Sequence, residues 1–466
     1  MTRLAIIAAA SLLLAGCASF SPDGGFGKVS QLTQERTGQG VALQRSPEDA
    51  QTAQNRVAEL LQAALTADAA VEVALLNNRG LQAKFGDLGI AESELVRAGR
   101  LKNPSLSFGR MSGGGGIEIE RTVLFDILGL LTMPMAKEVG QQRFEQAQYQ
   151  AAYDAVSLAA DVRRAYFDAV AAQELAKFYE QVKETADVSN ELAKRMLQAG
   201  NFNKLAQMRE QAFYADATAQ LARAQHQAAA QREKLIRLLG LYGEQLNFRL
   251  PQRLPELPKQ VLEPQNAEQT AMDKRLDVQM AKRAAEATAK SLHLTNATRM
   301  VNVLDVAYKN KSESGAPRAN GYEIELELPL FDFGSTRAAR AQATYMQAVN
   351  RTAEVAVNAR SEVREAYSAY RTAYDLAQHY RDEVVPLRKR ISEENLLRYN
   401  GMLIGVFELL ADAREQVAGV TGYVQALRDF WVAETNLQTA LTARSPAAGS
   451  VSQPAAAAGS ATAPGH

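Results

Sequence analysis

Residues 321–331, GYEIELELPLF, alternate between apolar and acidic side chains. Every second residue is apolar, and Glu323, Glu325 and Glu327 lie between them. Because side chains on a β-strand point to opposite faces in turn, this pattern predicts a strand with one apolar and one acidic face. Its length, about ten residues, is that of a tilted strand that crosses a membrane.

The same alternation occurs earlier in the chain, where Glu118 and Glu120 alternate with isoleucines and precede an apolar run. Each acidic segment follows a less regular apolar segment. The connection between the two is rich in glycine or in polar residues, as turns are. We therefore predict two β-hairpins, at about residues 104–126 and 299–331, with the glutamates on their polar faces.

The chain repeats itself around these hairpins. Residues 161–166, DVRRAY, match residues 362–367, EVREAY, 201 positions later. Residues 124–126, LFD, match residues 330–332 at an offset of 206. A difference of five residues in loop length reconciles the two offsets. Chance similarity between alanine-rich helices would give single matches, whereas an ordered series indicates a duplicated unit.

Each repeat has the same predicted order: a helix, the hairpin, a very long helix, a break at Gly200 or Gly401, and another long helix. Pro104, Pro134 and Pro329 are expected where strands meet helices, because proline interrupts both. At 1.5 Å per residue the longest helices would reach roughly 90–100 Å, which favours coiled-coil packing over a globular domain. The expected helices are 68–101, 136–198 and 203–242, then 266–296, 335–399 and 403–442.

The resulting boundaries are a first repeat at residues 51–249, a proline-rich linker at 250–265 and a second repeat at 266–443. The last segment, 444–466, consists mainly of Ala, Gly, Ser and Pro. Such a composition cannot bury a core, so we expect a disordered tail.

The N-terminus has the pattern of a secretion signal, with Arg3 before an apolar run of about a dozen residues. Residues 14–17, LAGC, resemble the lipobox of bacterial lipoproteins, in which the cysteine is acylated and becomes the new N-terminus. We expect a signal peptide at 1–16 and a lipidated linker at 17–50, with Cys17 as the lipid anchor. Ala18 in place of aspartate implies sorting to the outer membrane. An ordinary signal peptide with a chance cysteine is the alternative.

The composition excludes several classes of function. Lys plus Arg and Asp plus Glu both number 52, so no basic excess suggests a nucleic-acid partner. The single cysteine and the four separated histidines offer no metal-binding spacing, and no catalytic motif or cofactor site is evident. Beyond the N-terminus no run of 18 apolar residues occurs, which excludes a bundle of transmembrane helices but not a β-barrel.

Four strands per chain cannot close a barrel, and open sheet edges are not tolerated in lipid. The smallest bacterial barrels have about eight strands. A cyclic homotrimer would supply about twelve and close the sheet. The glutamates would then line the barrel lumen in threefold rings and favour cations. A pair of soluble hairpins on a helical protein is the competing interpretation.

These features together resemble the TolC-like outer-membrane efflux proteins, over roughly residues 60–443. The most specific segments are residues 328–334, LPLFDFG, and 398–401, RYNG, with weaker first-half copies at 125–129 and 196–200. The resemblance implies a mainly α-helical chain with a small transmembrane β part. Three chains would form a twelve-stranded β-barrel continued by a long periplasmic α-helical barrel. It further implies an exit duct, not an enzyme, that works with a periplasmic adaptor protein and an inner-membrane pump.

The resemblance also implies roles for single residues. Gly200 and Gly401 would lie at the periplasmic tips where the adaptor docks. Glu408 and Asp412 are candidates for the periplasmic gate, although the spacing from the glycine is one residue longer than is usual in the family. Two alternatives stay open: an exit channel for type I protein secretion, and a lipid-anchored coiled-coil scaffold or adhesin in the periplasm. The sequence does not identify the exported solute.

Overall fold

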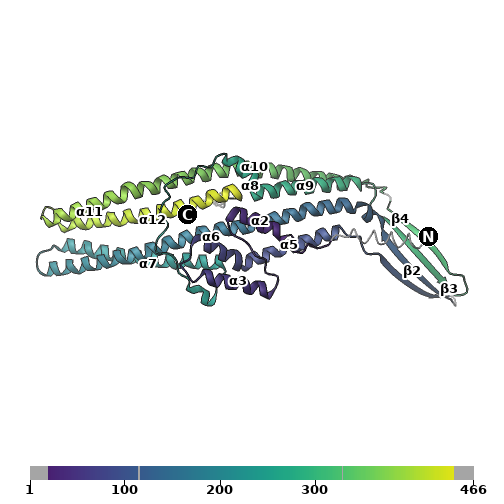
Figure 1. The fold of residues 1–466 in the computed structure, drawn as a ribbon, viewed down its shortest axis with the longest axis horizontal. Coiled ribbons are helices and arrows are strands. Elements are labelled where there is room, and N and C mark those ends of the chain that lie inside the picture. Colours follow the sequence, from purple (N-terminus) through teal and green to yellow (C-terminus); the bar gives the residue numbers. More distant parts are fainter. Residues whose placement is uncertain (1–18, 114–115, 328, 445–466) are drawn as a thin grey trace, which may run out of the picture.

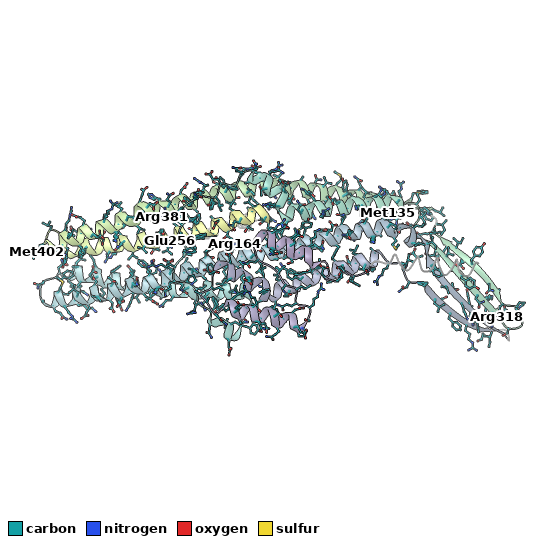
Figure 2. The ribbon with its side chains drawn as sticks, viewed as in Figure 1. Met135, Arg164, Glu256, Arg318, Arg381 and Met402 are labelled. Carbon is teal, nitrogen blue, oxygen red and sulfur yellow. The ribbon has the colours of Figure 1, made fainter. Side chains whose placement is uncertain are left out.

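The computed structural model describes residues 19–444 except 114, 115 and 328, so Cys17, the signal peptide and almost all of the C-terminal tail lie outside the described residues. The chain forms an elongated molecule with a small sheet at one end and two helical hairpins at the other (Figure 1). Arg318, next to the sheet in the connection between residues 313 and 319, and Met402 of a helix tip lie at these opposite ends (Figure 2).

The first repeat contains α4 (Ala67–Asn77), α5 (Arg79–Ala98), β1 (Ser105–Gly113), β2 (Gly116–Asp126), α6 (Ile127–Gln198) and α7 (Lys204–Leu239). The second contains α8 (Ala267–Lys274), α9 (Leu276–Ala297), β3 (Leu304–Glu313), β4 (Ala319–Leu326), α10 (Ser335–His379), α11 (Val385–Asn400) and α12 (Val406–Thr442). Two further helices, α2 (Phe26–Thr37) and α3 (Pro47–Leu60), precede α4, and a short 3₁₀ turn covers Gly243–Asn247. The predicted order of elements is therefore confirmed in both halves.

The four strands form one antiparallel sheet in the order β1-β2-β3-β4, which leaves β1 and β4 as its edges. An aspartate fixes the passage from strand to long helix in each repeat. The Asp126 carboxylate accepts a hydrogen bond from the Gly129 N–H at 2.6 Å, and Asp332 accepts one from the Ser335 N–H at 3.0 Å. Both satisfy a backbone donor at a helix start, as N-capping residues do.

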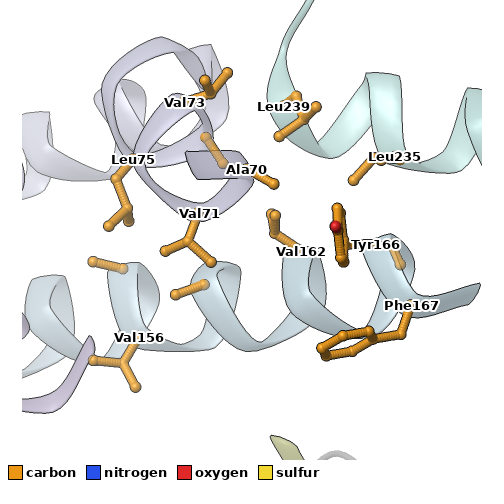
Figure 3. Close-up of a cluster of buried hydrophobic side chains, with 14 of the residues drawn as sticks. Ala70, Val71, Val73, Leu75, Val156, Val162, Tyr166, Phe167, Leu235 and Leu239 are labelled. Carbon is orange, nitrogen blue, oxygen red and sulfur yellow. The ribbon is translucent and has the colours of Figure 1, made fainter. Parts of the chain in front are cut away.

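The core lies at mid-length, where α4 and the end of α7 pack against α6. Val71 and Leu75 of α4 face Val162 of α6, and Leu235 and Leu239 of α7 complete the cluster (Figure 3). All five side chains are buried.

An aromatic cluster joins the two repeats. Phe167 of α6 stacks on Trp431 of α12 with ring centroids 5.4 Å apart, and Phe430 contacts Tyr370 of α10 at 5.6 Å. The inter-repeat linker packs onto this cluster, because the Trp431 indole donates a hydrogen bond to the carbonyl of Pro255.

Several expected boundaries are wrong. Residues 26–37, expected in an extended linker, form α2, which packs on α6 and buries Val29 and Thr33. Pro134 lies inside α6 rather than at its start, about two turns from the N-terminus of a helix of 72 residues. The second hairpin occupies only residues 304–326.

The single helices expected before each hairpin are each divided in two. Asn78 separates α4 from α5, and Arg275 separates α8 from α9. The long helix expected at 335–399 is also interrupted, by a π-helical segment at Tyr380–Val384. Pro386 follows that segment and lacks the N–H that would bond to the carbonyl of Asp382, which gives a physical reason for the irregular turn.

Candidate functional site

The sheet has two chemically distinct faces. Residues paired directly across antiparallel strands share a face, so the register assigns every side chain to a side. The polar face carries seven carboxylates, on Glu118, Glu120, Asp126, Asp305, Glu313, Glu323 and Glu325. The other face carries Leu106, Phe108, Ile117, Ile119, Val123, Phe125, Leu304, Val306, Tyr308, Tyr322, Ile324 and Leu326. It is mainly apolar, but it also carries Arg110, Ser112, Arg121, Asn310, Ser312 and Asn320. The predicted common face for the strand glutamates agrees with this register, except that Glu327 follows the last residue of β4.

The polar face also carries cations that the sequence reasoning missed. Lys309 contacts Glu120 at 3.7 Å and also pairs with Glu323, and Lys311 lies 2.7 Å from Glu118. The expectation of a face of one sign is therefore wrong in detail, although carboxylates still outnumber lysines. The signal was present in the sequence, since Lys309 and Lys311 alternate with Tyr308 and Asn310.

The apolar face of the sheet is uncovered in the single chain. The side chains of Leu106, Phe108 and Tyr322 are 77 %, 64 % and 81 % exposed, and Ile324 is 59 % exposed. A contiguous apolar patch of this kind marks an interaction with protein or membrane. None of the described helices combines the length and the hydropathy that a membrane-spanning helix requires.

The two helix tips lie at the end opposite to the sheet (Figure 1). Gly200 lies in the turn between α6 and α7 and has a φ of 75°, a conformation that favours glycine. Gly401, its counterpart by sequence, has a φ of −79°, and the left-handed residue of the second tip is Met402 with a φ of 56°. The two glycines therefore have corresponding positions but different backbone roles.

Glu408 and Asp412 do not share an environment. Glu408 lies in the first turn of α12 and is exposed, where the helix N-terminus favours a negative charge. Asp412 is 7 % exposed, and its Oδ2 atom has no hydrogen-bond partner among the described residues. The pair of gate acids expected from the resemblance is thus one solvated and one buried carboxylate.

A buried carboxylate near the tips connects the two hairpins. Glu210 of α7 is 1 % exposed and accepts a hydrogen bond from the Ser189 hydroxyl of α6 at 2.9 Å. Arg414 of α12 approaches its other oxygen at 3.6 Å. This contact ties the first hairpin to the second, and no sequence motif indicated it.

A second buried network lies at mid-length, at the break between α8 and α9. Arg275, 1 % exposed, donates to both carboxylate oxygens of Asp277, to Glu362 of α10 at 2.7 Å and to the carbonyl of Ala440 at 3.3 Å. Burial alone would lower the pKa of Arg275, but its hydrogen bonds and charge interactions with Asp277 and Glu362 outweigh that effect and raise it. The network fixes α8, α10 and α12 to one another.

No group of three or more potential metal ligands occurs among residues 19–444 outside the gaps named above.

No protein-family profile matches the chain, and no curated protein matches its sequence. Several solved structures, in contrast, are similar to this chain in fold. The outer-membrane channel OprN is 19 % identical over 88 % of this chain and 95 % of its own, with a TM-score of 0.69. The outer membrane protein VceC of Vibrio cholerae is 15 % identical over 81 % and 96 %, with a TM-score of 0.67. The open-state MtrE outer membrane channel of Neisseria gonorrhoeae is 16 % identical over 80 % and 88 %, with a TM-score of 0.64.

The neighbours therefore share this architecture almost from end to end, at sequence identities that establish fold alone. The chain has the fold of the TolC-like outer-membrane channels.

Proposed function

We propose that this protein is the outer-membrane exit channel of a tripartite efflux system. The observation that carries the proposal is the two-faced sheet with unpaired edges, at the end of a helix of 72 residues. Such a sheet exposes a mainly apolar face, interrupted by Arg110 and Arg121, and a face rich in carboxylates, which suits lipid outside and water inside.

The proposal requires oligomerisation. The edges β1 and β4 have no partner within the described chain, and unpaired strand edges are not stable in lipid. Three copies, joined β4 to β1, would give about twelve strands and a closed barrel. The helices would continue the duct into the periplasm, and Cys17 would anchor the N-terminus in the outer membrane by its acyl chains.

The tips support a role in docking. Met402 and Leu403 of the second tip are 94 % and 77 % exposed, which leaves an apolar end for a periplasmic adaptor that connects the duct to an inner-membrane pump. In the barrel, the carboxylates that exceed Lys309 and Lys311 would make the lumen cation-preferring. A reversal potential in planar bilayers that indicates anion preference of the barrel would contradict that part.

A matched pair of substitutions tests the channel itself. Leu106 and Ser107 are neighbours on β1 but lie on the apolar and polar faces, respectively. The cost of a lysine on a lipid-facing strand position depends on its depth, from about 0–1 kcal/mol near the interfaces to about 2–4 kcal/mol at the bilayer midplane, whereas a lumen-facing lysine does not meet lipid. We expect Leu106→Lys, one residue from the start of β1, to reduce assembly in the outer membrane and conductance in planar bilayers, and Ser107→Lys to retain both.

The channel would be contradicted if wild-type protein did not conduct and the two variants assembled equally well in the outer membrane. That result would favour the periplasmic scaffold.

A further inference from the structure

A basic groove crosses three helices between the sheet and mid-length. It has a volume of about 600 Å³ and runs over α9, with α6 on one side and α10 on the other. Figure 1 shows α9 beside α10 in the half of the molecule next to the sheet. The charged lining residues are Arg143 of α6 and Arg337 and Arg340 of α10.

The groove exists because α9 presents small side chains along one face. Ala284, Ala287, Thr288 and Ser291 follow at spacings of three and four residues, so they form one stripe of the helix. The flanking helices contribute longer side chains, which leave a depression over α9. The floor is thus apolar and hydroxyl-bearing, and the walls are cationic.

Positive charge in the groove is uncompensated by its lining. Three guanidinium groups and no carboxylate occur among the described lining residues. Two acids of α6 close to Arg143 in the sequence are paired with cations of α9: Glu145 with Arg283 at 3.3 Å and Glu138 with Lys290 at 3.4 Å.

One of the three arginines is held in place by the backbone. Arg337 donates to the carbonyls of Thr298 and Arg299 at 3.0 and 3.3 Å. Arg143 and Arg340 are exposed and form no ion pair with a described carboxylate. Guanidinium groups bind carboxylate and phosphate oxygens through two parallel hydrogen bonds, so this lining suits an oxyanion.

These arginines are not a requirement of the repeated fold. In the first repeat the corresponding turns of α6, residues 131–135, read LTMPM and carry no charged side chain. The two long helices nevertheless start in the same way, at Asp126 and Asp332. Packing of the repeat therefore does not explain the charge of the groove.

The groove lies on the side of α6 opposite to α2. Gln148 of α6 donates to the carbonyl of Gly25, next to α2, whereas Gln146 lines the groove. Two residues along an α-helix are about 200° apart, so these side chains point to nearly opposite sides. In the proposed trimer α2 and α3 are placed outside the helical barrel, where they do not obstruct the duct, and the groove then lies on the side of the lumen.

We propose that this groove is an oxyanion-binding site in the lumen, one per protomer, which takes phosphate- or carboxylate-bearing solutes as they approach the acidic β-barrel. The inference that the site faces the lumen rests on the proposed channel. The binding site itself does not.

Inorganic pyrophosphate is the probe, and Arg143→Gln/Arg340→Gln is the test variant. Lys282→Gln is the matched control, because Lys282 is an exposed cation of α9 that does not line the groove. Binding is measured by isothermal titration calorimetry on the detergent-solubilised protein. We expect the double variant to bind about tenfold or more weakly than wild type, since each lost charged hydrogen bond costs about that factor. The control is expected to bind as wild type does.

Single-channel recording with pyrophosphate then locates the site. Block of the wild-type and Lys282→Gln currents, relieved in the double variant, supports a lumen site. No saturable binding to wild type, or equal binding by all three proteins, overturns the oxyanion site even if the channel conducts. Binding without block in a conducting channel overturns its placement in the lumen. A protein that binds but does not conduct contradicts the proposed channel and the lumen placement, and leaves the groove assignment supported by the calorimetry.

Discussion

The two repeats follow the same path but stabilise it with different chemistry. In the first, the break between α4 and α5 is fixed by neutral amides: Asn77 donates to the carbonyl of Gly240 at 2.7 Å, and Asn78 to that of Leu238 at 2.9 Å. In the second, the equivalent break is fixed by the Arg275 guanidinium, which reaches Ala440 at the end of α12. Both arrangements satisfy carbonyls at the end of the last helix of the repeat.

Other contacts are retained in both repeats. Arg163 pairs with Asp68 at 2.5 Å, and Arg364, 201 positions later, pairs with Glu268 at 2.9 Å. Each pair joins the long helix to the helix before the break. The duplicated geometry is therefore fixed at mid-length in both repeats, whereas the charge of the supporting residues differs between them.

The largest expected effect comes from removing the ionic junction. Arg275→Met leaves Asp277 and Glu362 without their cation, and breaking a buried pair in this way costs about 3–5 kcal/mol. Asn78→Ala in the first repeat removes neutral hydrogen bonds and is expected to cost about 1–2 kcal/mol. Thermal unfolding of the detergent-solubilised variants measures both losses. Equal losses would show that the two junctions do not differ as described.

The next effect concerns the π-helical segment, which the first repeat lacks. A Cβ at Gly422 of α12 would lie 2.7 Å from the Tyr380 ring, whereas one at Gly419 would lie 3.4 Å from the flexible Arg388 side chain. We expect Gly422→Ala to destabilise by about 1–3 kcal/mol through overpacking. Gly419→Ala is expected to be neutral or to stabilise by up to about 1 kcal/mol, because alanine favours helix. Destabilisation by Gly419→Ala alone would reverse this assignment.

A smaller effect distinguishes the two tips. Gly200 has a φ of 75° and Gly401 a φ of −79°. A non-glycine residue in the left-handed region costs about 1–2 kcal/mol, so Gly200→Ala is expected to destabilise and Gly401→Ala is not. For the same reason Met402→Gly is expected to stabilise the second tip. Chemical denaturation monitored by circular dichroism tests the order, and identical effects at the two glycines would contradict it.

The smallest effect is expected at the acid of the second tip. Three copies of the exposed Glu408 in a trimer would repel one another, with screening by water and salt. Glu408→Ala is expected to raise the single-channel conductance of the isolated trimer modestly, more at low ionic strength. Unchanged conductance at low salt would remove Glu408 from the gate.

Much of the fold follows from local pattern. The hairpins, the long helices and the glutamate face depend on periodicity, which local sequence carries in full. The assignment of α2 failed because its apolar residues are sparse, and burial of Val29 against α6 is a tertiary effect. The only local signal of the π-helical segment is Pro386, whose effect on the helix lies several residues upstream.

The site was less accessible from sequence. Which cations accompany the glutamates depends on the strand register, which places Lys311 opposite Glu120. The contact of Glu210 with Arg414 joins segments about 200 residues apart, and no local pattern encodes such a contact. The burial of Asp412 is likewise not evident from its neighbours in the sequence. The groove over α9 likewise depends on three helices from both repeats.

In the proposed channel the free edges β1 and β4 of three chains close one barrel. Cysteine pairs scanned along the two strands, one cysteine on β1 and one on β4, test it directly by oxidation in outer-membrane fractions and denaturing electrophoresis. We expect pairs in register to give covalent dimers and trimers, and the series to stop at three chains. Variants with a single cysteine are expected to stop at the dimer or to stay monomeric. A series that continues beyond three, or pairs that link only within one chain, would contradict it.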